Sequence, residues 1–396
     1  MLAKIPIIDS SITCREILAG LKDIYNKEAN LRFSAAISEF VRAKQVFLTG
    51  SGIAAFYIIL KSLSAKSKRK EVVLPAYTAG SLVIAVLKAG LIPVLCDISL
   101  EDFNFDRQGV FDLTGKNTLA VNCVHMFGIG ISDLLNVRQI LSDEVTLIED
   151  CAQSFGSKVN GRQVGSFTEI SFFSFNRGKN LPLYDGGCIC LNSEKINNNL
   201  RSTYELLLDE RDTFSTLSII MKLFAISLAT HPSIYGLGQP LISKFKETKP
   251  PKDFMIKRMS DLQAGFGLKL LEKADAISLS RNKNGSYLIN CLKDIDGLIL
   301  PRIAEGSAPA FNRLPLIFKS FGKRALAQVK LWEAGIESSR MYERPLHHMF
   351  NLGYSAKDFP KACYFAEGLL TLPVHPSMKE SNLNMICEVI KKVCSQ

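Results

Sequence analysis

Short apolar runs alternate with longer segments of helical pattern through the first half of this 396-residue chain. Each run is short enough for a buried strand, and the segments between carry apolar residues at helical spacing. Strands that alternate with helices predict an α/β protein with three αβα layers and a mostly parallel central sheet. The strands are expected at 46–49, 71–74, 92–96, 118–124, 146–148, 169–175 and 188–191, and the helices within 10–45 and at 53–60, 81–89 and 133–141.

The pattern changes in the last part of the chain. A long helix is predicted from Arg258 to about Asn290, with Ser260 as its N-cap. A strand at 312–317, a helix at 324–334 that ends at Gly335, a strand at 371–375 and a helix at 380–392 follow. We therefore expect a large domain over residues 1–245, and a linker helix with a smaller C-terminal α+β domain over 246–396.

The segment 214–242 is strongly apolar, but Lys222, His231-Pro232 and two glycines interrupt it. Its uninterrupted part is too short to span a membrane comfortably. Two interpretations stay open. The segment is a packed helix followed by a turn, or it is an interfacial hairpin that makes peripheral contact with a membrane or a lipid-linked substrate.

Composition narrows the class of protein. A hydrophobic content of 47% with 22% charged residues is that of a globular chain. The net charge of +10 suits anionic ligands such as phosphates or nucleotide sugars. The dense basic run 66–70 reads as a solvated loop, and no signature of a nucleic-acid partner is present.

Ten cysteines are scattered singly, mostly in apolar contexts. This usage predicts buried free thiols in a reducing compartment, and the first residues show no secretory signal, so we expect a cytoplasmic protein. Cys188 and Cys190 share one face of a predicted strand, but no second Cys/His pair accompanies them, so no metal site is predicted. His347, His348 and His375 receive no role.

Polar clusters follow the predicted strands at the points where they end. A Gly50-Ser51-Gly52 turn lies between a strand and a helix, an arrangement that aims backbone N–H groups at an anion. Ligands of parallel sheets collect at the carboxyl ends of the strands. The clusters are Gly50-Ser51, Tyr77-Thr78, His125, Asp150–Gln153 and the Lys179 loop.

Lys179 lies in a loop between two buried strands. Desolvation lowers the pKa of a lysine, so its neutral amine can form a Schiff base with a carbonyl compound; the alternative is a turn lysine that merely neighbours a core strand. With Asp150, Gln153 and the Gly50–Gly52 turn, it supplies the parts of a pyridoxal 5'-phosphate site. The lysine would hold the aldehyde, and the carboxylate would face the pyridine nitrogen. The amide would donate to the phenolic oxygen, and the turn would hold the phosphate.

The ordered motifs resemble those of the DegT/DnrJ/EryC1/StrS family of sugar aminotransferases over nearly the whole chain. They include Ser51-Gly52-Ile-Ala-Ala55, Pro75-Ala-Tyr-Thr78, Gly90-Leu-Ile-Pro-Val94 with Asp97, His125-Met-Phe-Gly128, Glu149-Asp-Cys-Ala-Gln153, Gly165, Ser174-Phe-(x3)-Lys179, Gly186-Gly187, Arg258-Met-Ser-(x2)-Gln263 and Leu372-Pro-Val-His-Pro376. The resemblance implies the aspartate-aminotransferase type of fold, the fold type I of pyridoxal-phosphate-dependent transferases.

The resemblance also implies a two-step amino transfer. Glutamate would aminate the cofactor, and the pyridoxamine form would aminate a keto sugar, usually nucleotide-linked, for surface polysaccharide or amino-sugar biosynthesis. Lys179 would move the proton as general base and acid. Family members are typically homodimers with sites at the interface. The alternatives are a cofactor-dependent sugar dehydratase, whose relatives tend to replace the lysine, and a catalytically silent ligand-binding member.

Further site residues carry less specific expectations. Tyr77, His125, Ser174 and Arg177 are assigned to the cofactor side, and Tyr342 and Arg344 to the substrate side. His125 is either a support for Asp150 and the ring or a satisfied buried histidine. The chain departs from the family pattern at three places: Ile53 removes a hydroxyl from the phosphate turn, Ala79 replaces an aromatic residue, and 254–256 lacks the asparagine usually lent across the dimer.

Overall fold

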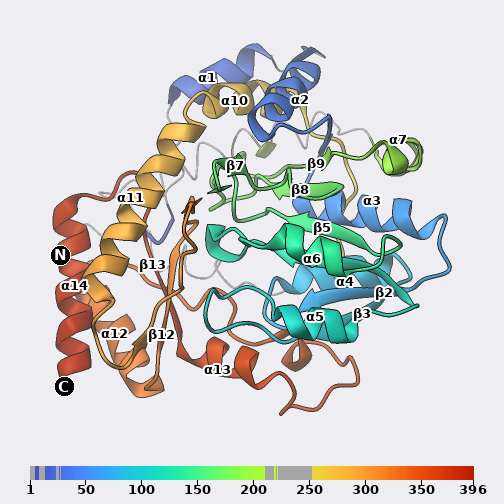
Figure 1. Ribbon diagram of the computed structural model, residues 1–396. Coiled ribbons are helices and arrows are strands. Elements are labelled where there is room, and N and C mark those ends of the chain that lie inside the picture. The colour runs from blue at the N-terminus through green and yellow to red at the C-terminus, as the bar shows by residue number, and fades with distance from the viewer. Residues whose placement is uncertain are drawn as a thin grey trace.

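The computed structural model describes residues 5–8, 14–23, 26, 28–209, 218–219, 221 and 252–396. Its centre is a seven-stranded sheet with the strand order β1-β9-β8-β5-β4-β2-β3 (Figure 1). The strands are β1 Gln45–Thr49, β2 Glu71–Pro75, β3 Ile92–Cys96, β4 Thr118–Val124, β5 Thr146–Asp150, β8 Ile170–Ser174 and β9 Gly187–Leu191. All seven coincide with the predicted strands to within two residues at each end.

The sheet is mostly parallel, as predicted. Strands β3, β2, β4, β5 and β8 pair in parallel, and β9 is antiparallel to both β8 and β1. Because two antiparallel pairings separate β1 from β8, these two strands run in the same direction. The carboxyl ends of β1, β2, β4, β5 and β8 therefore lie along one edge, where the polar clusters were expected.

Successive side chains of each strand enter the apolar clusters on opposite faces of the sheet. In β2, Val72 and Leu74 enter the cluster under one set of helices, and Val73 enters the cluster on the opposite face. This period of two is what a sheet buried on both faces requires. One face is covered by α3 Gly52–Ser64, α4 Gly80–Lys88, α7 Glu194–Leu207 and α13 Pro360–Gly368, and the other by α2 Glu28–Val41, α5 Arg107–Leu113, α6 Leu134–Ile140 and α10 Asp261–Leu271.

A second, antiparallel sheet in the order β10-β12-β13 forms the core of the C-terminal part. Its apolar side chains pack with those of three helices in one buried cluster, and Figure 1 shows α11 (Ala274–Leu292) and α14 (Glu380–Ser395) running along its outer side. The elements are β10 Leu298–Ile299, β12 Leu314–Phe318, β13 Leu369–Leu372, α11 Ala274–Leu292, α12 Phe321–Glu333 and α14 Glu380–Ser395.

The two parts of the chain interlock. Helix α10 packs against α1 (Cys14–Lys22) and α2 from the beginning of the chain. The short strand β11 (Ser307–Ala308) pairs with β6 (Lys158–Val159), which pairs in turn with β7 (Arg162–Gln163). The predicted boundary at residues 245 and 246 lies outside the described residues, and the two-domain division stays a prediction.

Several element predictions need correction. The single long helix predicted from Arg258 to Asn290 is two helices, α10 and α11, which are separated at Glu272 and Lys273. Neither residue is a helix breaker, and Lys273 forms an ion pair with the buried Glu16 at this turn. The N-cap prediction is confirmed, because Ser260 forms a capping box with Gln263. Helices α5, α7 and α13 were not predicted.

Two further expectations concern apolar segments and cysteines. The segment 214–242 lies almost entirely outside the described residues, so neither interpretation of it is tested. Among the helices that are described, none combines the length and the apolar character needed to cross a bilayer. The nine cysteines whose side chains are described are free thiols, and Cys188 and Cys190 are buried in the same cluster, as their spacing predicts.

Candidate active site

The turn after β1 meets the end of the Lys179 loop. Ser51 forms a bridge with Gly186, whose backbone N–H donates to the carbonyl of Gly50 at 2.8 Å. The N–H of Gly50 is engaged by the carbonyl of Lys257 at 2.6 Å. Both backbone polar groups of Gly50 are therefore used in hydrogen bonds within the protein, and these bonds tie the turn to segments far apart in the sequence.

Close packing explains the glycine at position 52. A Cβ atom on Gly52 would lie 2.7 Å from the Cβ of Ser174 at the end of β8. Ser51 is the N-cap of α3, and its Oγ accepts from the N–H of Ala54 at 3.2 Å. The predicted anion turn thus stands at a helix N-terminus, where backbone N–H groups and the helix dipole favour a negative group.

Asp150 lies at the carboxyl end of β5 and is buried. Its carboxylate accepts from the N–H of Ala152 at 3.0 Å and from the side-chain amide of Asn122 on β4 at 3.4 Å. Burial raises the pKa of Asp150, although these two donors and the charge of Lys179 oppose the shift. The positive groups around the Asp150 carboxylate therefore do not fully offset the cost of its burial, and a cationic ligand group would stabilise its charged form.

Lys179 lies in the loop between β8 and β9 and interacts electrostatically with this carboxylate. Burial lowers the pKa of its ammonium group to about 8; the nearby Asp150 opposes that shift, and the guanidinium of Arg313 adds to it. A pKa of about 8 leaves roughly a tenth of the side chain as neutral amine at pH 7. The lysine is therefore a usable nucleophile and proton acceptor, as the sequence predicts for this loop.

Hydrogen bonds from two asparagines hold the loop on both sides of Lys179. The amide of Asn180 donates to the carbonyls of Phe155 at 3.0 Å and Ala310 at 2.6 Å. The amide of Asn312 donates to the carbonyl of Gly178 at 2.5 Å. The position of the lysine thus depends on the C-terminal segment around residues 310–312.

Tyr77 and Tyr342 form an aromatic wall between the two parts of the chain. The hydroxyl of Tyr77 donates to the carbonyl of Tyr342 at 2.9 Å, and the two ring centroids lie 5.7 Å apart. The amide of Gln153 reaches the hydroxyl of Tyr342 at 3.5 Å, and its oxygen accepts from the N–H of Phe127 at 3.1 Å. Burial raises the pKa of both tyrosines, with the charge of Asp150 adding to the shift at Tyr342.

His125 is fully buried and both its ring nitrogens have partners. Nδ1 accepts from the N–H of Ile131 at 3.0 Å, and Nε2 lies 3.1 Å from the carboxylate of Glu149. Glu149 also accepts from the backbone N–H groups of Gly165, Phe167 and Thr168 at 2.7 to 2.8 Å. Both ring nitrogens of His125 are therefore satisfied by hydrogen bonds, and its assignment to the cofactor side stays a prediction.

The two predicted arginines, Arg177 and Arg344, are both exposed. The guanidinium carbon of Arg177 lies 5.7 Å from the centroid of the Tyr184 ring. Ser174 is half-buried beside Gly52. Their assignment to the cofactor or substrate side stays a prediction.

Arg313 is a site residue that the sequence reasoning missed. Burial lowers the pKa of its guanidinium, which acts electrostatically on Lys179 and on both tyrosines. Its Nη1 donates to the hydroxyl of Ser339 at 2.8 Å, and its Nε is buried without a partner in the described part of the chain. The available signal was a charged residue just before the apolar run of β12, a weak one by itself.

The positions that depart from the family pattern are apolar contacts. Ile53 and Ile256 both pack against the large apolar cluster, and Phe254 lies edge-on to Tyr57 with ring centroids 5.6 Å apart. The neighbouring Met255 is 71% exposed. None of these side chains can supply the hydroxyl or amide found in the family pattern.

The described residues fit pyridoxal phosphate. The cofactor would bring an aldehyde for an amine of lowered pKa, a protonated ring nitrogen for a buried carboxylate, and a phosphate for a helix N-terminus. Lys179, Asp150 and Ser51 provide these three features on one edge of the sheet.

The fold and this site define the class of the protein. The chain superimposes on Helicobacter pylori PseC, an aminotransferase involved in the biosynthesis of pseudoaminic acid, with a TM-score of 0.79 and 18% identity over 99% of both chains. It superimposes on the PLP form of Spr1654 from Streptococcus pneumoniae with a TM-score of 0.78 and 20% identity, again over 99% of both chains. The fold is that of pyridoxal-phosphate-dependent aminotransferases.

Sequence comparison gives the family. Residues 13–391 match the model of the DegT/DnrJ/EryC1/StrS aminotransferase family, and the chain belongs to this family. One of its relatives is the GDP-perosamine synthase of Escherichia coli O157:H7, which is 28% identical over 369 residues, or 92% of this chain and 90% of the relative. The predicted family and fold class are thereby confirmed, and aminotransferases of this family depend on pyridoxal phosphate.

Proposed function

We propose that this protein is a transaminase that moves an amino group from glutamate to a nucleotide-linked keto sugar for surface polysaccharide or amino-sugar biosynthesis. The observation that carries the proposal is the half-buried Lys179, of pKa about 8, opposite the buried Asp150. Similarity to a GDP-perosamine synthase supports a nucleotide-linked sugar as the acceptor.

Each residue of the site has a proposed task. Lys179 would hold pyridoxal phosphate covalently through its Nζ atom, Asp150 would accept from the ring nitrogen, and the Ser51 turn would bind the phosphate. Gln153 would lie beside the ring through the amide that now reaches Tyr342. When bound, the cofactor supplies an electron-withdrawing ring that stabilises negative charge on the substrate carbon.

The chain itself would carry out the proton transfer. With a pKa of about 8, the Nζ of Lys179 can take up a proton from the substrate carbon and return it at neutral pH. The carboxylate of Asp150 balances the positive charge that develops on Lys179. Tyr77 and Tyr342 keep their hydroxyl protons, because burial raises both pKa values, and their rings would exclude water from this side.

We also propose a cytoplasmic homodimer. The segment 254–257, where the family pattern puts the residue lent to the partner, is held against the phosphate turn through the Lys257 carbonyl. The exposed Met255 on this segment provides apolar area for such an interface. Sedimentation of the purified protein tests the assembly, and a monomer at micromolar concentration would contradict it.

The sugar dehydratase and the silent ligand-binding member are the rival functions. The lysine that a dehydratase of this family tends to replace is present and lies opposite Asp150. A silent protein has no chemical need for a half-buried lysine of lowered pKa that interacts with a buried carboxylate. These features favour the transaminase.

The decisive experiment uses the purified protein. We expect a yellow colour, and borohydride reduction should attach the cofactor to the peptide that contains Lys179, as read by mass spectrometry. Glutamate should then bleach the colour and release 2-oxoglutarate. A colourless protein that takes up no pyridoxal phosphate would contradict both enzyme functions, and bleaching without 2-oxoglutarate would contradict a transaminase.

Peripheral membrane contact through 214–242 is a separate proposal. Flotation with liposomes, with and without deletion of these residues, tests it directly. If the intact protein stays at the bottom of the gradient, the segment is not a membrane contact.

A further inference from the structure

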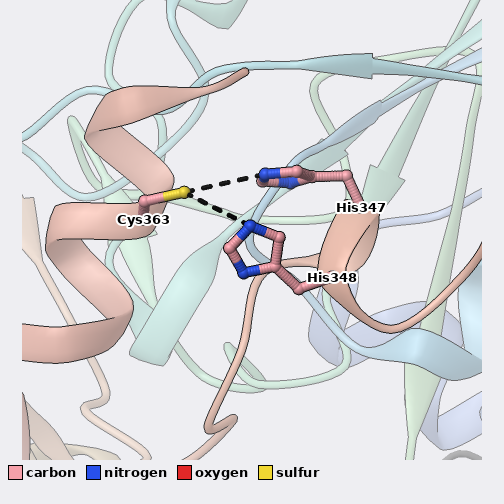
Figure 2. A group of neighbouring side chains, drawn as sticks. All are labelled: His347, His348 and Cys363. Carbon is pink, nitrogen blue, oxygen red and sulfur yellow. Dashed lines mark hydrogen bonds between the residues drawn. The ribbon is translucent and has the colours of Figure 1, made fainter. Parts of the chain in front are cut away.

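Two histidines and a cysteine converge at a place that the proposed function does not use. His347 and His348 belong to the single helical turn η2 (Leu346–His348), and Cys363 lies on α13. Figure 2 shows both imidazoles directed at the sulfur. The Nε2 atoms lie 3.6 Å (His347) and 3.9 Å (His348) from Sγ, and the three ligand atoms are all within 4.8 Å of one another.

These separations are those of ligands around one zinc ion. Zinc binds imidazole nitrogen at about 2.0–2.1 Å and thiolate sulfur at about 2.3 Å, in tetrahedral geometry. Two such bonds at the tetrahedral angle put nitrogen and sulfur about 3.6 Å apart. One observed distance equals this value, and the other exceeds it by an amount that a side-chain rotation removes.

The surroundings complete a cation site. The carbonyl oxygen of Ala356 accepts a 2.9 Å hydrogen bond from the Nε2 of His348 and lies 3.9 Å from the Sγ of Cys363; a bound ion would replace the proton of that hydrogen bond. The carboxylates of Asp97 and Asp358 act electrostatically on the cluster. A fourth oxygen ligand and nearby negative charge are therefore both available.

We propose that His347, His348 and Cys363 bind Zn²⁺, with the Ala356 carbonyl or a water molecule in the fourth position. One thiolate and two imidazoles are a donor set that suits this ion. His347 is buried, Cys363 is half-buried and His348 is exposed, so the ion can enter from solvent. The proposal does not depend on the proposed function.

The bound ion would join two segments that line the candidate active site. The N–H of Leu346 in η2 donates to the carbonyl of Ala76 at 2.7 Å, next to Tyr77. On α13, Phe365 packs edge-on against Tyr77, with ring centroids 4.8 Å apart. Zinc would therefore fix the position of η2 relative to α13 behind the aromatic wall, without touching the reacting groups.

The test measures metal binding on the full-length protein with its cofactor bound and any purification tag removed. Competition with a chromogenic chelator should give one Zn²⁺ per chain, and Co²⁺ should give the visible spectrum of a tetrahedral site. The variants His348→Ala and Cys363→Ser should each weaken Zn²⁺ binding by roughly 100-fold or more, since each removes a direct ligand. The matched control Cys394→Ser, at another half-buried cysteine, should bind as the native protein does.

Thermal melts show whether a variant has lost zinc binding only because it has unfolded. Because His348 is exposed, His348→Ala should melt without metal at the native temperature. Zn²⁺ should raise the melting temperature of the native protein and of Cys394→Ser, and leave both ligand variants unchanged. The proposal would be overturned if the native protein took up no zinc, or if His348→Ala and Cys363→Ser bound Zn²⁺ as tightly as the native protein.

Discussion

The side-chain amide of Asn312 donates a 2.5 Å hydrogen bond to the carbonyl of Gly178, the residue directly before Lys179. Asn312 lies just before β12, the central strand of the C-terminal sheet, whereas Gly178 belongs to the loop at the edge of the seven-stranded sheet. The two parts of the chain therefore meet beside Lys179. A residue of the C-terminal part can thus set where this amine lies.

The variant Asn312→Ala should lower transaminase activity more than it lowers stability. Loss of the bond frees the Gly178 carbonyl and lets the loop relax, and a small displacement of a reacting group is costly to catalysis. We expect kcat to fall by roughly 10- to 100-fold, with a loss of about 1–2 kcal/mol in unfolding free energy. Steady-state kinetics and chemical denaturation measure the two effects.

Asn282→Ala is the matched control for Asn312→Ala. Its amide donates to the carbonyl of Pro309 at 3.0 Å, close to the same segment but away from the Lys179 loop. It should cost a similar amount of stability and leave kcat near the native value. Equal losses of kcat in both variants would show that the Gly178 bond has no special role.

The reactivity of Lys179 should follow a titration centred near pH 8. Burial lowers its pKa to about 8, so the neutral fraction of the amine rises with pH up to that value and then levels off. The rate at which cofactor-free protein takes up pyridoxal phosphate, followed by absorbance, should show this profile. A rate that keeps rising toward pH 10 would indicate a lysine of ordinary pKa.

Two neighbours should shift this midpoint in opposite directions. Asp150 raises the pKa of Lys179, so Asp150→Asn should move the midpoint to lower pH. Arg313 lowers the pKa, so Arg313→Met should move the midpoint to higher pH. A shift of the same sign in both variants would contradict the electrostatic assignment.

The sequence located this site because its chemistry is local to the strand ends. Lys179, Asp150 and the Gly50–Gly52 turn each follow a short apolar run, and the parallel arrangement of these runs brings their ends to one edge. Each run can be recognised in the sequence by itself. The rule that ligands bind at the carboxyl edge of a parallel sheet then suffices to group the polar residues that follow the runs.

The contributions from the C-terminal part were beyond this reasoning. Arg313 and Asn312 reach the site through tertiary packing, and a single polar residue before a strand has many ordinary explanations. Helix α7 went unpredicted although its sequence carries a signal, since Ile196, Leu200 and Tyr204 lie four residues apart on its buried face. The break between α10 and α11 carries no glycine or proline, so no sequence signal marks it.

Arg313 should determine the affinity for the carboxylate substrate. Arg313 is half-buried and acts electrostatically on Lys179 and Tyr342. Its buried Nε has no partner in the described residues, and a guanidinium of this kind suits a carboxylate. Arg313→Met should raise the KM for glutamate by roughly 10- to 100-fold, the loss of a charge-assisted hydrogen bond of about 1.5–3 kcal/mol. The KM for the keto sugar should change far less.

The matched control for Arg313 is Arg340→Met, at another arginine of the C-terminal part. Its guanidinium donates to the carbonyl of Ala366 at 2.7 Å. Arg340 is not among the main causes of the pKa shifts of Lys179 and Asp150. Its substitution should leave the KM for glutamate unchanged. If both arginines affected glutamate and keto sugar alike, a role in carboxylate binding would be wrong.

Removal of Lys179 should stabilise the cofactor-free protein. The pKa of Lys179 is about 8 in the fold against an ordinary 10.5, so between these values the unfolded chain binds more protons, and the unfolding free energy rises with pH. Below pH 8 both states carry the proton, and the full cost of burying the charge is present, at most about 3 kcal/mol. Lys179→Met removes this cost, because the methionine side chain carries no charge.

The sign and the pH window make this effect easy to recognise. At pH 7 the Lys179→Met protein should unfold at higher denaturant than the native chain, and the difference should shrink steadily from about pH 8 toward 10.5. Lys195→Met, at an exposed lysine of α7, should show no such pH-dependent difference. The prediction would be wrong if Lys179→Met were less stable than the native chain at pH 7, or if the difference in unfolding free energy did not vary with pH. Either result would show that the fold does not destabilise the charged form of Lys179. Because the proposed bond to the cofactor and the proposed proton transfer both need that amine, the same substitution that stabilises the fold should abolish transaminase activity.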